Sequence, residues 1–293
     1  MVDSQSFIGG FYWGFSGLLA WGIADYLARG ASRRIGSVST TLLTQLIGLA
    51  LPLAFVVAEA ATGRLSVDIP GLMLWAPLTG AALGFGYLVY YTGLARGAVT
   101  VVSSAASAWL AVTVLIAVAL FGESVGAGQM ALMAGVLLGI LLLSAGPLTG
   151  SEVSSGLPWG LATMLGIGMA MALFDHATAA AGPMLAVLVV RAISAIPSCA
   201  LALARRMPIR RPQDCNGWAL LAAIGVVDAA GYVGYNLGVA AAPVSLVAPI
   251  AAAHPLVTIA LAVGINRERP RITQWAGASL IIAATIALSV FAN

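Results

Sequence analysis

The chain has 293 residues, of which 61% are hydrophobic and only 8% are charged, and its mean hydropathy is +1.02. Since a soluble domain carries roughly 25% charged residues, this composition excludes an ordinary soluble protein. The thirteen basic residues are all arginines, and the net charge is +3. Because these arginines cluster in short predicted loops, they are typical of topology signals and not of a nucleic-acid surface. The composition therefore predicts a protein embedded in a lipid bilayer.

Apolar stretches long enough to cross a bilayer follow one another along the whole chain. About 20 apolar residues span the hydrocarbon core at 1.5 Å per residue. The predicted spans are 8–28, 36–58, 71–92, 98–121, 126–146, 157–177, 184–204, 216–238, 244–265 and 272–291. The first is expected to be a retained helix, because the segment before it lacks the positive charge of a signal peptide. The predicted fold class is an all-α membrane protein with ten transmembrane helices.

The second half of the sequence repeats the first at a shift of 145 or 146 residues. The aligned pairs include Trp13 with Trp159, Gly22 with Gly168, Tyr87 with Tyr232, Tyr90 with Tyr235, Gly93 with Gly238, Thr113 with Thr258, Glu123 with Glu268 and Gln129 with Gln274. We predict two five-helix repeats, residues 1–150 and 151–293. An odd number of spans requires the second repeat to be inverted. Inverted repeats give a transporter two nearly equivalent states around a central site, although some channels also contain them.

The joints near the end of each repeat carry a family resemblance. They read Phe121-Gly-Glu123 with Gln129, and Asn266-Arg-Glu268 with Gln274. The passages beginning at Tyr90 and Tyr235 also match one another. In these features the chain resembles the EamA family of the drug/metabolite transporter (DMT) superfamily. The resemblance implies a bacterial inner-membrane carrier that moves amino acids or other small metabolites by alternating access, commonly as an exporter.

The orientation of the chain is the point on which two expectations disagree. The resemblance implies that both termini lie in the cytoplasm. That placement would put every loop arginine except Arg64 outside the cell. The excess of arginine in cytoplasmic loops favours the opposite orientation, with both termini outside.

An acidic residue stands in the middle of the eighth predicted span. Ionisable groups cost roughly 2.5–3.5 kcal/mol on insertion scales, so they need a partner or a function. Asp228 shares one helical face with Tyr232, Tyr235 and Asn236. This face is predicted to line a transport cavity; the alternative is a polar stripe that bonds a neighbouring helix.

Arg191 is the arginine that falls inside a predicted span. Its guanidinium group could bind a substrate carboxylate or phosphate, or it could pair with Asp228 or Asp175 and hold helices together. Gln45 occupies the duplicated position in the first repeat. Both positions are therefore expected near the interface between the repeats.

Two further titratable residues are candidates for coupling transport to an ion. Asp25 could bind a proton or cation, or it could pair with Arg29 near a helix end. His254 lies between Pro249 and Pro255. There it could titrate, or it could bond a carbonyl group freed by a helix break. A proton-coupled carrier would use Asp25, Asp228 or His254, whereas exchange or facilitated diffusion would need none of them.

Aromatic residues complete the predicted cavity. Trp109 is the repeat counterpart of His254, and Tyr87 and Tyr90 reproduce the aromatic pattern of the eighth span. Each could instead fill a hydrophobic core. No zinc-protease motif, nucleophile elbow or P-loop is found, so we expect no catalytic residues, cofactor or metal, and no direct use of ATP.

The competing functions therefore differ in the substrate that the protein transports, or in whether it transports a substrate at all. The favoured prediction is a carrier for a small-molecule substrate such as an amino acid, acting as a monomer or a homodimer. A multidrug or quaternary-cation exporter would require an acid facing aromatic residues. A non-transporting intramembrane enzyme or a structural protein would not need the duplication.

Overall fold

The computed structural model of the chain describes residues 4–97, 99–122, 126–144, 151–241, 247, 250–267 and 271–291. These residues are helical, without a strand among them. The helices are α1 (Ser4–Ile35), α2 (Ser37–Ile47), α3 (Ala50–Ala61), α4 (Ile69–Arg96), α5 (Val99–Ser107), α6 (Trp109–Phe121), α7 (Ala127–Ser144), α8 (Ser151–Ala181), α9 (Pro183–Ser194), α10 (Ile196–Ala204), α11 (Cys215–Ala241), α13 (Pro255–Asn266) and α14 (Ile272–Phe291).

Helical segments occur at each of the predicted spans. In the described part of the chain, six segments are long and apolar enough to cross a membrane: 37–61, 69–96, 101–121, 156–181, 183–204 and 215–238. Shorter apolar helices cover 130–139, 250–265 and 272–284. The first predicted span lies within α1, which continues for 32 residues to Ile35. The prediction of an all-α membrane protein is therefore confirmed.

Several predicted spans contain a break that divides them into two shorter helices. The breaks fall at Gly48, Ala108, Ala195 and His254, between the helices of one span. The break at His254 was expected, because Pro255 begins α13 without needing a backbone hydrogen-bond partner. The break at Ala108 has no proline nearby in its sequence, so periodicity alone did not reveal it.

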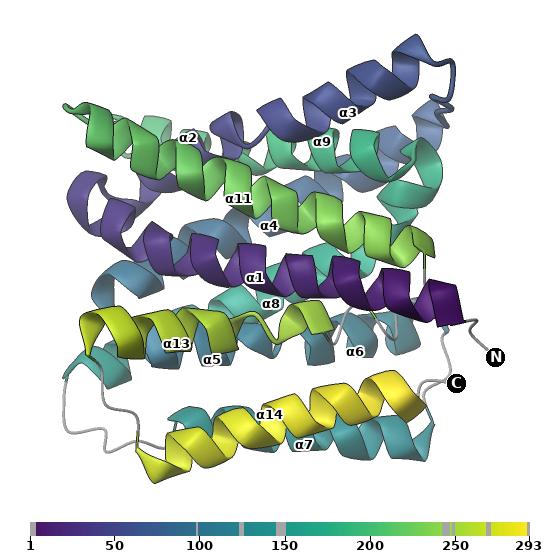
Figure 1. Cartoon of the computed structure of the whole chain (residues 1–293). Helices are drawn as coiled ribbons and strands as arrows, with labels where there is room; N and C mark the ends of the chain where they lie inside the picture. The colour runs from purple at the N-terminus through teal and green to yellow at the C-terminus, as the bar shows by residue number, and fades with distance from the viewer. Residues whose placement is uncertain are drawn as a thin grey trace.

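The two repeats are interleaved in the helix bundle. Helix α1 packs along α11 of the second repeat, α4 packs along α8, and α7 packs along α14 (Figure 1). The first helix of each repeat therefore contacts the fourth helical segment of the other repeat. This exchange places residues from both repeats around the centre of the bundle.

Glycines allow equivalent close contacts between the repeats. A Cβ atom at Gly22 of α1 would lie 2.5 Å from Val257 Cβ of α13. A Cβ atom at Gly168 of α8 would lie 2.5 Å from Val112 Cβ of α6. Gly22 and Gly168 are duplicated positions, and so are Val112 and Val257. The duplication read from the sequence is thus reproduced as a pair of matching helix–helix contacts.

Hydroxyl groups join the same two seams in the same way. Thr258 Oγ1 donates a hydrogen bond to Gly22 O at 3.1 Å. Thr113 Oγ1 donates to Gly168 O at 3.0 Å. Each bond connects duplicated positions of the two repeats, so the repeats are related by an approximate two-fold axis in their local contacts.

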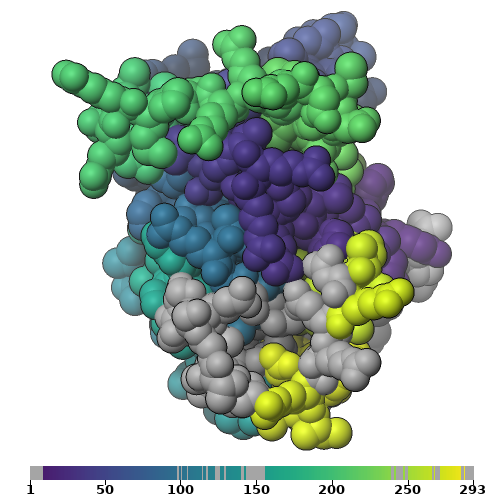
Figure 2. Space-filling view, turned by 90° about the vertical axis from the view of Figure 1, so that its left-hand side faces the viewer, coloured from purple at the N-terminus to yellow at the C-terminus, as the bar shows by residue number. Residues whose placement is uncertain are grey.

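The two ends of the bundle differ in charge. Helix α1 begins and α14 ends at the same end of the bundle (Figure 1). The opposite end, which Figure 2 views directly, carries the arginines at the ends of helices and in the loops between them. In the described residues these are Arg29, Arg33, Arg34, Arg96, Arg205, Arg206, Arg210, Arg211, Arg267 and Arg271. A hollow of about 800 Å³ lies there between Arg34, Arg210 and Arg211.

One of the duplicated motif residues has a clear structural role. Gln274 Oε1 accepts a hydrogen bond of 2.9 Å from the backbone N–H of Arg271 at the start of α14. A side chain that reaches back in this way satisfies a free donor of the helix N-terminus. Glu123, Glu268 and the side chain of Gln129 lie outside the described residues.

Candidate functional site

A small cavity lies at the centre of the bundle where the two repeats meet. Its volume is about 30 Å³, which accommodates water but no metabolite. Its walls come from α1, α4, α5, α6, α8, α11 and the break before α13. The lining residues are Trp21, Asp25, Tyr87, Tyr90, Ala106, Trp109, Ile167, Met171, Tyr232 and His254.

Duplicated positions face one another across this cavity. The lining contains both members of four pairs: Trp21 and Ile167, Asp25 and Met171, Tyr87 and Tyr232, and Trp109 and His254. The cavity therefore lies on the approximate two-fold axis. The pairs have diverged chemically, because the side with Asp25 and His254 is titratable whereas the side with Met171 and Trp109 is not.

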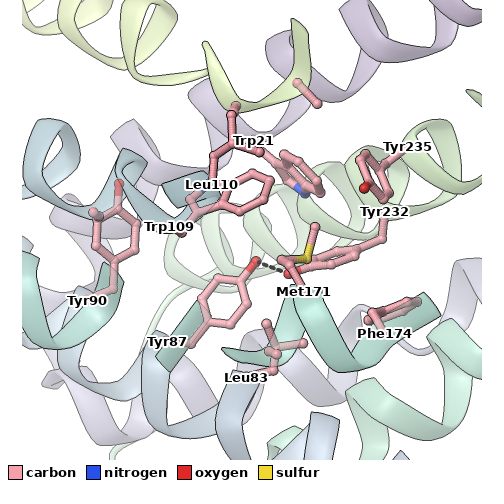
Figure 3. Close-up of a cluster of buried hydrophobic side chains, with 14 of the residues drawn as sticks. Trp21, Leu83, Tyr87, Tyr90, Trp109, Leu110, Met171, Phe174, Tyr232 and Tyr235 are labelled. Atoms are coloured by element: carbon pink, nitrogen blue, oxygen red, sulfur yellow. Dashed lines mark hydrogen bonds between the residues drawn. The ribbon is translucent and has the colours of Figure 1, made fainter. Parts of the chain in front are cut away.

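The tyrosine pair marks the axis itself. Tyr87 Oη lies 3.2 Å from Tyr232 Oη, and both side chains are buried (Figure 3). These residues are equivalents in the two repeats. A contact between equivalent residues can form only where a two-fold axis passes between them. The two tyrosines thus form a shared wall of the cavity.

A buried ion pair lies behind this tyrosine wall. Arg191 Nη1 on α9 donates to Asp228 Oδ2 on α11 at 2.5 Å, and both side chains are almost completely buried. Tyr87 Oη donates to Asp228 Oδ1 at 2.6 Å. The Arg191 guanidinium group also lies 5.5 Å from the centre of the Tyr232 ring. The Tyr87 hydroxyl group lies within donor distance of both Asp228 Oδ1 and Tyr232 Oη.

The ion pair belongs to the second repeat only. The positions that correspond to Arg191 and Asp228 in the first repeat are Gln45 and Leu83, and both are buried. The guanidinium group packs against Gly48, where a Cβ atom would overlap Nη2. Arg191 Nε and Nη2 have no hydrogen-bond partner. The pair therefore retains unused donors in a buried site.

A second pair of titratable groups lines the cavity itself. Asp25 Oδ2 on α1 lies 3.0 Å from His254 Nδ1, and the two residues are 4% and 8% exposed. Although these atoms are close, their angles do not make a hydrogen bond, and each lacks another partner. Trp21 Nε1 nearby is also without a partner. Three polar atoms at this end of the cavity are therefore unsatisfied.

A family comparison now identifies the chain. The model of the EamA-like transporter family matches residues 8–145 and again residues 154–290. The chain belongs to the EamA-like transporter family. It is therefore a multi-pass membrane transporter of the DMT superfamily, built from two family repeats.

Solved structures agree with the fold of this EamA-like transporter. Twenty-three chains match, and one of them is a crystal structure described only as that of a protein. It has a TM-score of 0.68 and 20% sequence identity, over 97% of this chain and 97% of the other. At this identity the likeness concerns the fold alone. No curated protein matches the sequence.

The structure of this EamA-like transporter separates the predicted site residues into two groups. The cavity brings together Asp25, Tyr87, Tyr90, Trp109, Tyr232 and His254. Asp228 and Arg191 lie behind Tyr87 and Tyr232, so they are not part of the cavity lining. Of the partners considered for Arg191, the structure selects Asp228.

Three further predicted residues lie outside the cavity lining. Tyr235 packs 5.8 Å from the Trp21 ring. Asn236 Nδ2 donates to Tyr232 O at 2.8 Å within its own helix. Gln45 is buried near the break between α2 and α3. Their positions favour helix packing, as the alternative interpretation of the polar face supposed.

The expectation that Asp25 lies near a helix end was wrong. Helix α1 extends ten residues beyond it, to Ile35, and the side chain of Asp25 points to the bundle centre. The ionisable group beside it is His254, on a segment far away in the sequence.

Three cavity residues were missed in the sequence: Ala106, Ile167 and Met171. Ile167 and Met171 are uncharged, so nothing in their chemistry marked them. The duplication could have found them, because a shift of 146 residues carries Trp21 and Asp25 onto Ile167 and Met171.

Proposed function

We propose that this EamA-like transporter is a secondary-active carrier of small metabolites such as amino acids, and that it works by alternating access as an exporter in the bacterial inner membrane. The observation that carries the proposal is the cavity on the approximate two-fold axis. Both repeats line it with equivalent residues, including Tyr87 and Tyr232. A carrier needs such a site, because each repeat must be able to open it in turn.

Ten crossings in two inverted repeats form part of this proposal. The chain begins and ends at the same end of the bundle (Figure 1), which requires an even number of crossings. Five crossings in each repeat satisfy this requirement. Each repeat must then enter the membrane from the opposite side.

The conformation described here is best interpreted as occluded. The seam at Gly22 and the seam at Gly168 are equally close, each with a 2.5 Å approach to a valine Cβ position. In an inverted repeat these seams serve opposite sides of the membrane. Since both are closed, the cavity between them is sealed and small.

A second substrate class has a specific observation in its favour. The described lining of the cavity contains an acid and five aromatic residues, and no arginine. Aromatic faces and a carboxylate attract a cationic group. An amine or quaternary cation is therefore the alternative substrate to a zwitterionic amino acid.

The proposed function is tested by counterflow in reconstituted vesicles. Vesicles that contain the purified protein are loaded with one unlabelled compound from a panel of amino acids and amines. Entry of the labelled form of the same compound is then measured without an ion gradient. We expect saturable counterflow for at least one ammonium-bearing class. Its absence for every class, with protein shown to be folded, would contradict a carrier; flux that does not saturate would indicate a channel.

The orientation follows from the arginine-rich end of the bundle. We expect this end to face the cytoplasm, which places both termini outside the cell. Cys215 at the start of α11 is exposed at this end, and Cys199 is the other cysteine. In a Cys199→Ala variant, a membrane-impermeant thiol reagent should label Cys215 in inside-out vesicles and not in intact cells.

A matched reporter on the opposite end completes this measurement. Ser66 is exposed in the segment between α3 and α4. With both native cysteines replaced by alanine, Ser66→Cys should be labelled in intact cells. The reverse pattern for the two reporters would show that the family expectation, with both termini in the cytoplasm, applies to this chain.

A further inference from the structure

The titratable end of the cavity places a carboxylate oxygen next to an imidazole nitrogen, and neither atom has a hydrogen-bond partner. Asp25 Oδ2 and His254 Nδ1 are 3.0 Å apart, and both atoms accept hydrogen bonds when the imidazole carries its proton on Nε2. Two such acceptors repel one another in a buried site. A proton on His254 Nδ1, or a cation beside the two atoms, removes this repulsion and compensates the Asp25 carboxylate.

Within the part of the chain that the structure describes, the residues lining the cavity supply no positive charge besides that of a protonated His254. Helix α4 contributes Tyr87 and Tyr90, and α11 contributes Tyr232. Tyr90 Oη is bonded to Ser103 Oγ at 3.0 Å. The residues that α5, α6 and α8 place in the lining (Ala106, Trp109, Ile167 and Met171) do not titrate. Two charged groups beyond the tyrosine wall, Asp228 and Arg191, neutralise each other.

The rest of the wall suits the body of an amphipathic molecule. The Trp21 ring lies 5.9 Å from the His254 ring, at a steep angle. The aromatic side chains of Trp21, Tyr87, Tyr90, Trp109 and Tyr232 line the cavity (Figure 3). The opposite side offers Ile167 and Met171, the uncharged counterparts of Trp21 and Asp25. An apolar group can pack against that side while an ammonium group lies at Asp25.

We propose that Asp25 and His254 form a site that holds either a proton or the ammonium group of the transported substrate, so that one is exchanged for the other. This inference rests on the proposed function and names the substrate class of the same cavity: ammonium compounds with an apolar body. In the empty carrier His254 holds the proton beside the Asp25 carboxylate. When the substrate ammonium group binds Asp25, the proton leaves His254 to water on the side of entry, and the net charge of the site does not change.

Binding measurements with three related probes test this exchange. Phenethylamine, phenylalanine and phenylpropionate share a phenyl ring and differ in charge. Binding to the purified protein is followed by calorimetry between pH 5.5 and pH 8.5 in buffers of different ionisation enthalpy. We expect phenethylamine to release about one proton per molecule bound. As the pH is raised, the affinity for phenethylamine should increase by up to about tenfold per pH unit for as long as the pair still holds its proton.

The remaining probes define the substrate class. Phenylalanine should bind with the same proton release, because its ammonium group is the part recognised. Phenylpropionate should not compete with phenethylamine. Equal competition by phenylpropionate, or phenethylamine binding that releases no proton, would overturn the inference.

Two substitutions assign the effect to the pair. His254→Gln removes the titrating group but keeps a polar side chain, so phenethylamine binding should continue and become independent of pH. Asp25→Asn should weaken phenethylamine binding at least about tenfold, the loss of one ionic contact. If Asp25→Asn fails to fold, His254→Gln still decides the result; pH-dependent proton release by folded His254→Gln would contradict the inference.

The chain contains a matched control for histidine titration. His176, the other histidine, stacks on Trp75 at 4.5 Å and lies outside the cavity. His176→Gln should leave proton release on phenethylamine binding unchanged, and its loss would overturn the assignment to His254. Counterflow separates the two proposals: counterflow by wild-type protein without proton release contradicts this inference alone, whereas absent counterflow contradicts the carrier.

Discussion

Replacing Arg191 by glutamine and Asp228 by leucine together is expected to leave the protein folded, whereas either change alone destabilises it strongly. Each single change leaves one charge uncompensated in a buried site, which costs about 3–5 kcal/mol. The double change copies the Gln45 and Leu83 positions of the first repeat, where no ion pair exists. Replacement of a whole buried pair by packed neutral groups is often close to neutral.

Chemical unfolding in detergent micelles measures this difference. The stability of the double variant should lie closer to that of the wild type than either single variant does. If both single variants unfold like the wild type, the pair is solvated and contributes little. If the double variant is the least stable of the three, the second repeat cannot accept the packing of the first.

Transport assays of variants at the same two positions test whether the ion pair is needed for function. Asp228→Asn should abolish counterflow while the chain still inserts into the membrane, because it removes the charge that pairs with Arg191 and leaves one acceptor oxygen for both Tyr87 and Arg191. Normal counterflow by this variant would remove Asp228 from the site. Arg191→Gln should reduce the flux of neutral and anionic substrates equally, since Arg191 lies behind Tyr232 and pairs with Asp228. A selective loss for anionic substrates would show that Arg191 binds them directly.

The helices and the duplication could be predicted because both depend on local patterns. Apolar length identified the helical segments, and Trp13, Gly22 and Tyr87 recur at a shift of 145 or 146 residues. The structure then uses the duplicated glycines for equivalent seams. The helix break at Ala108 was not predicted, because no proline marks it in the sequence.

The site was predicted only in part because it depends on contacts between distant segments. Asp228 stood out as a charge in an apolar span, but two partners were possible for Arg191. The pairing of Asp25 with His254 was not foreseen. It requires α1 to pack against the break before α13, and neither hydropathy nor spacing contains that information. The glutamines of the family motif carried the resemblance, and the structure gives Gln274 a role in bonding the backbone at the start of its helix.

A methyl group at Gly22 or at Gly168 is expected to hold open one seam of the carrier and to stop transport. The added Cβ would lie 2.5 Å from a valine Cβ and 2.7 Å from a backbone carbonyl oxygen, that of His254 or of Trp109. Backbone cannot move aside as a flexible side chain can, so the helices must separate. Overpacking of this kind costs about 1–3 kcal/mol.

Gly30→Ala provides the control on the same helix. A Cβ atom at Gly30 has nothing within 4 Å. Alanine there should therefore stabilise α1 by up to about 1 kcal/mol, the difference in helix propensity. Thermal unfolding and counterflow of the three variants should distinguish the crowded glycines from the free one. Loss of counterflow in Gly30→Ala would show that α1 tolerates no change, and the argument from crowding would fail.

The two crowded glycines should also act in opposite directions across the membrane. Ala106 lines the cavity, and Ala106→Cys in a background without Cys199 and Cys215 reports on its access. Gly22→Ala opens the seam between α1 and α13, and Gly168→Ala opens the equivalent seam between α8 and α6. If the repeats are inverted, the first variant exposes the reporter to an impermeant thiol reagent on one side of the membrane and the second variant on the other. Labelling from the same side in both variants would mean that the repeats are parallel, and a cavity between parallel repeats would have no second, equivalent opening.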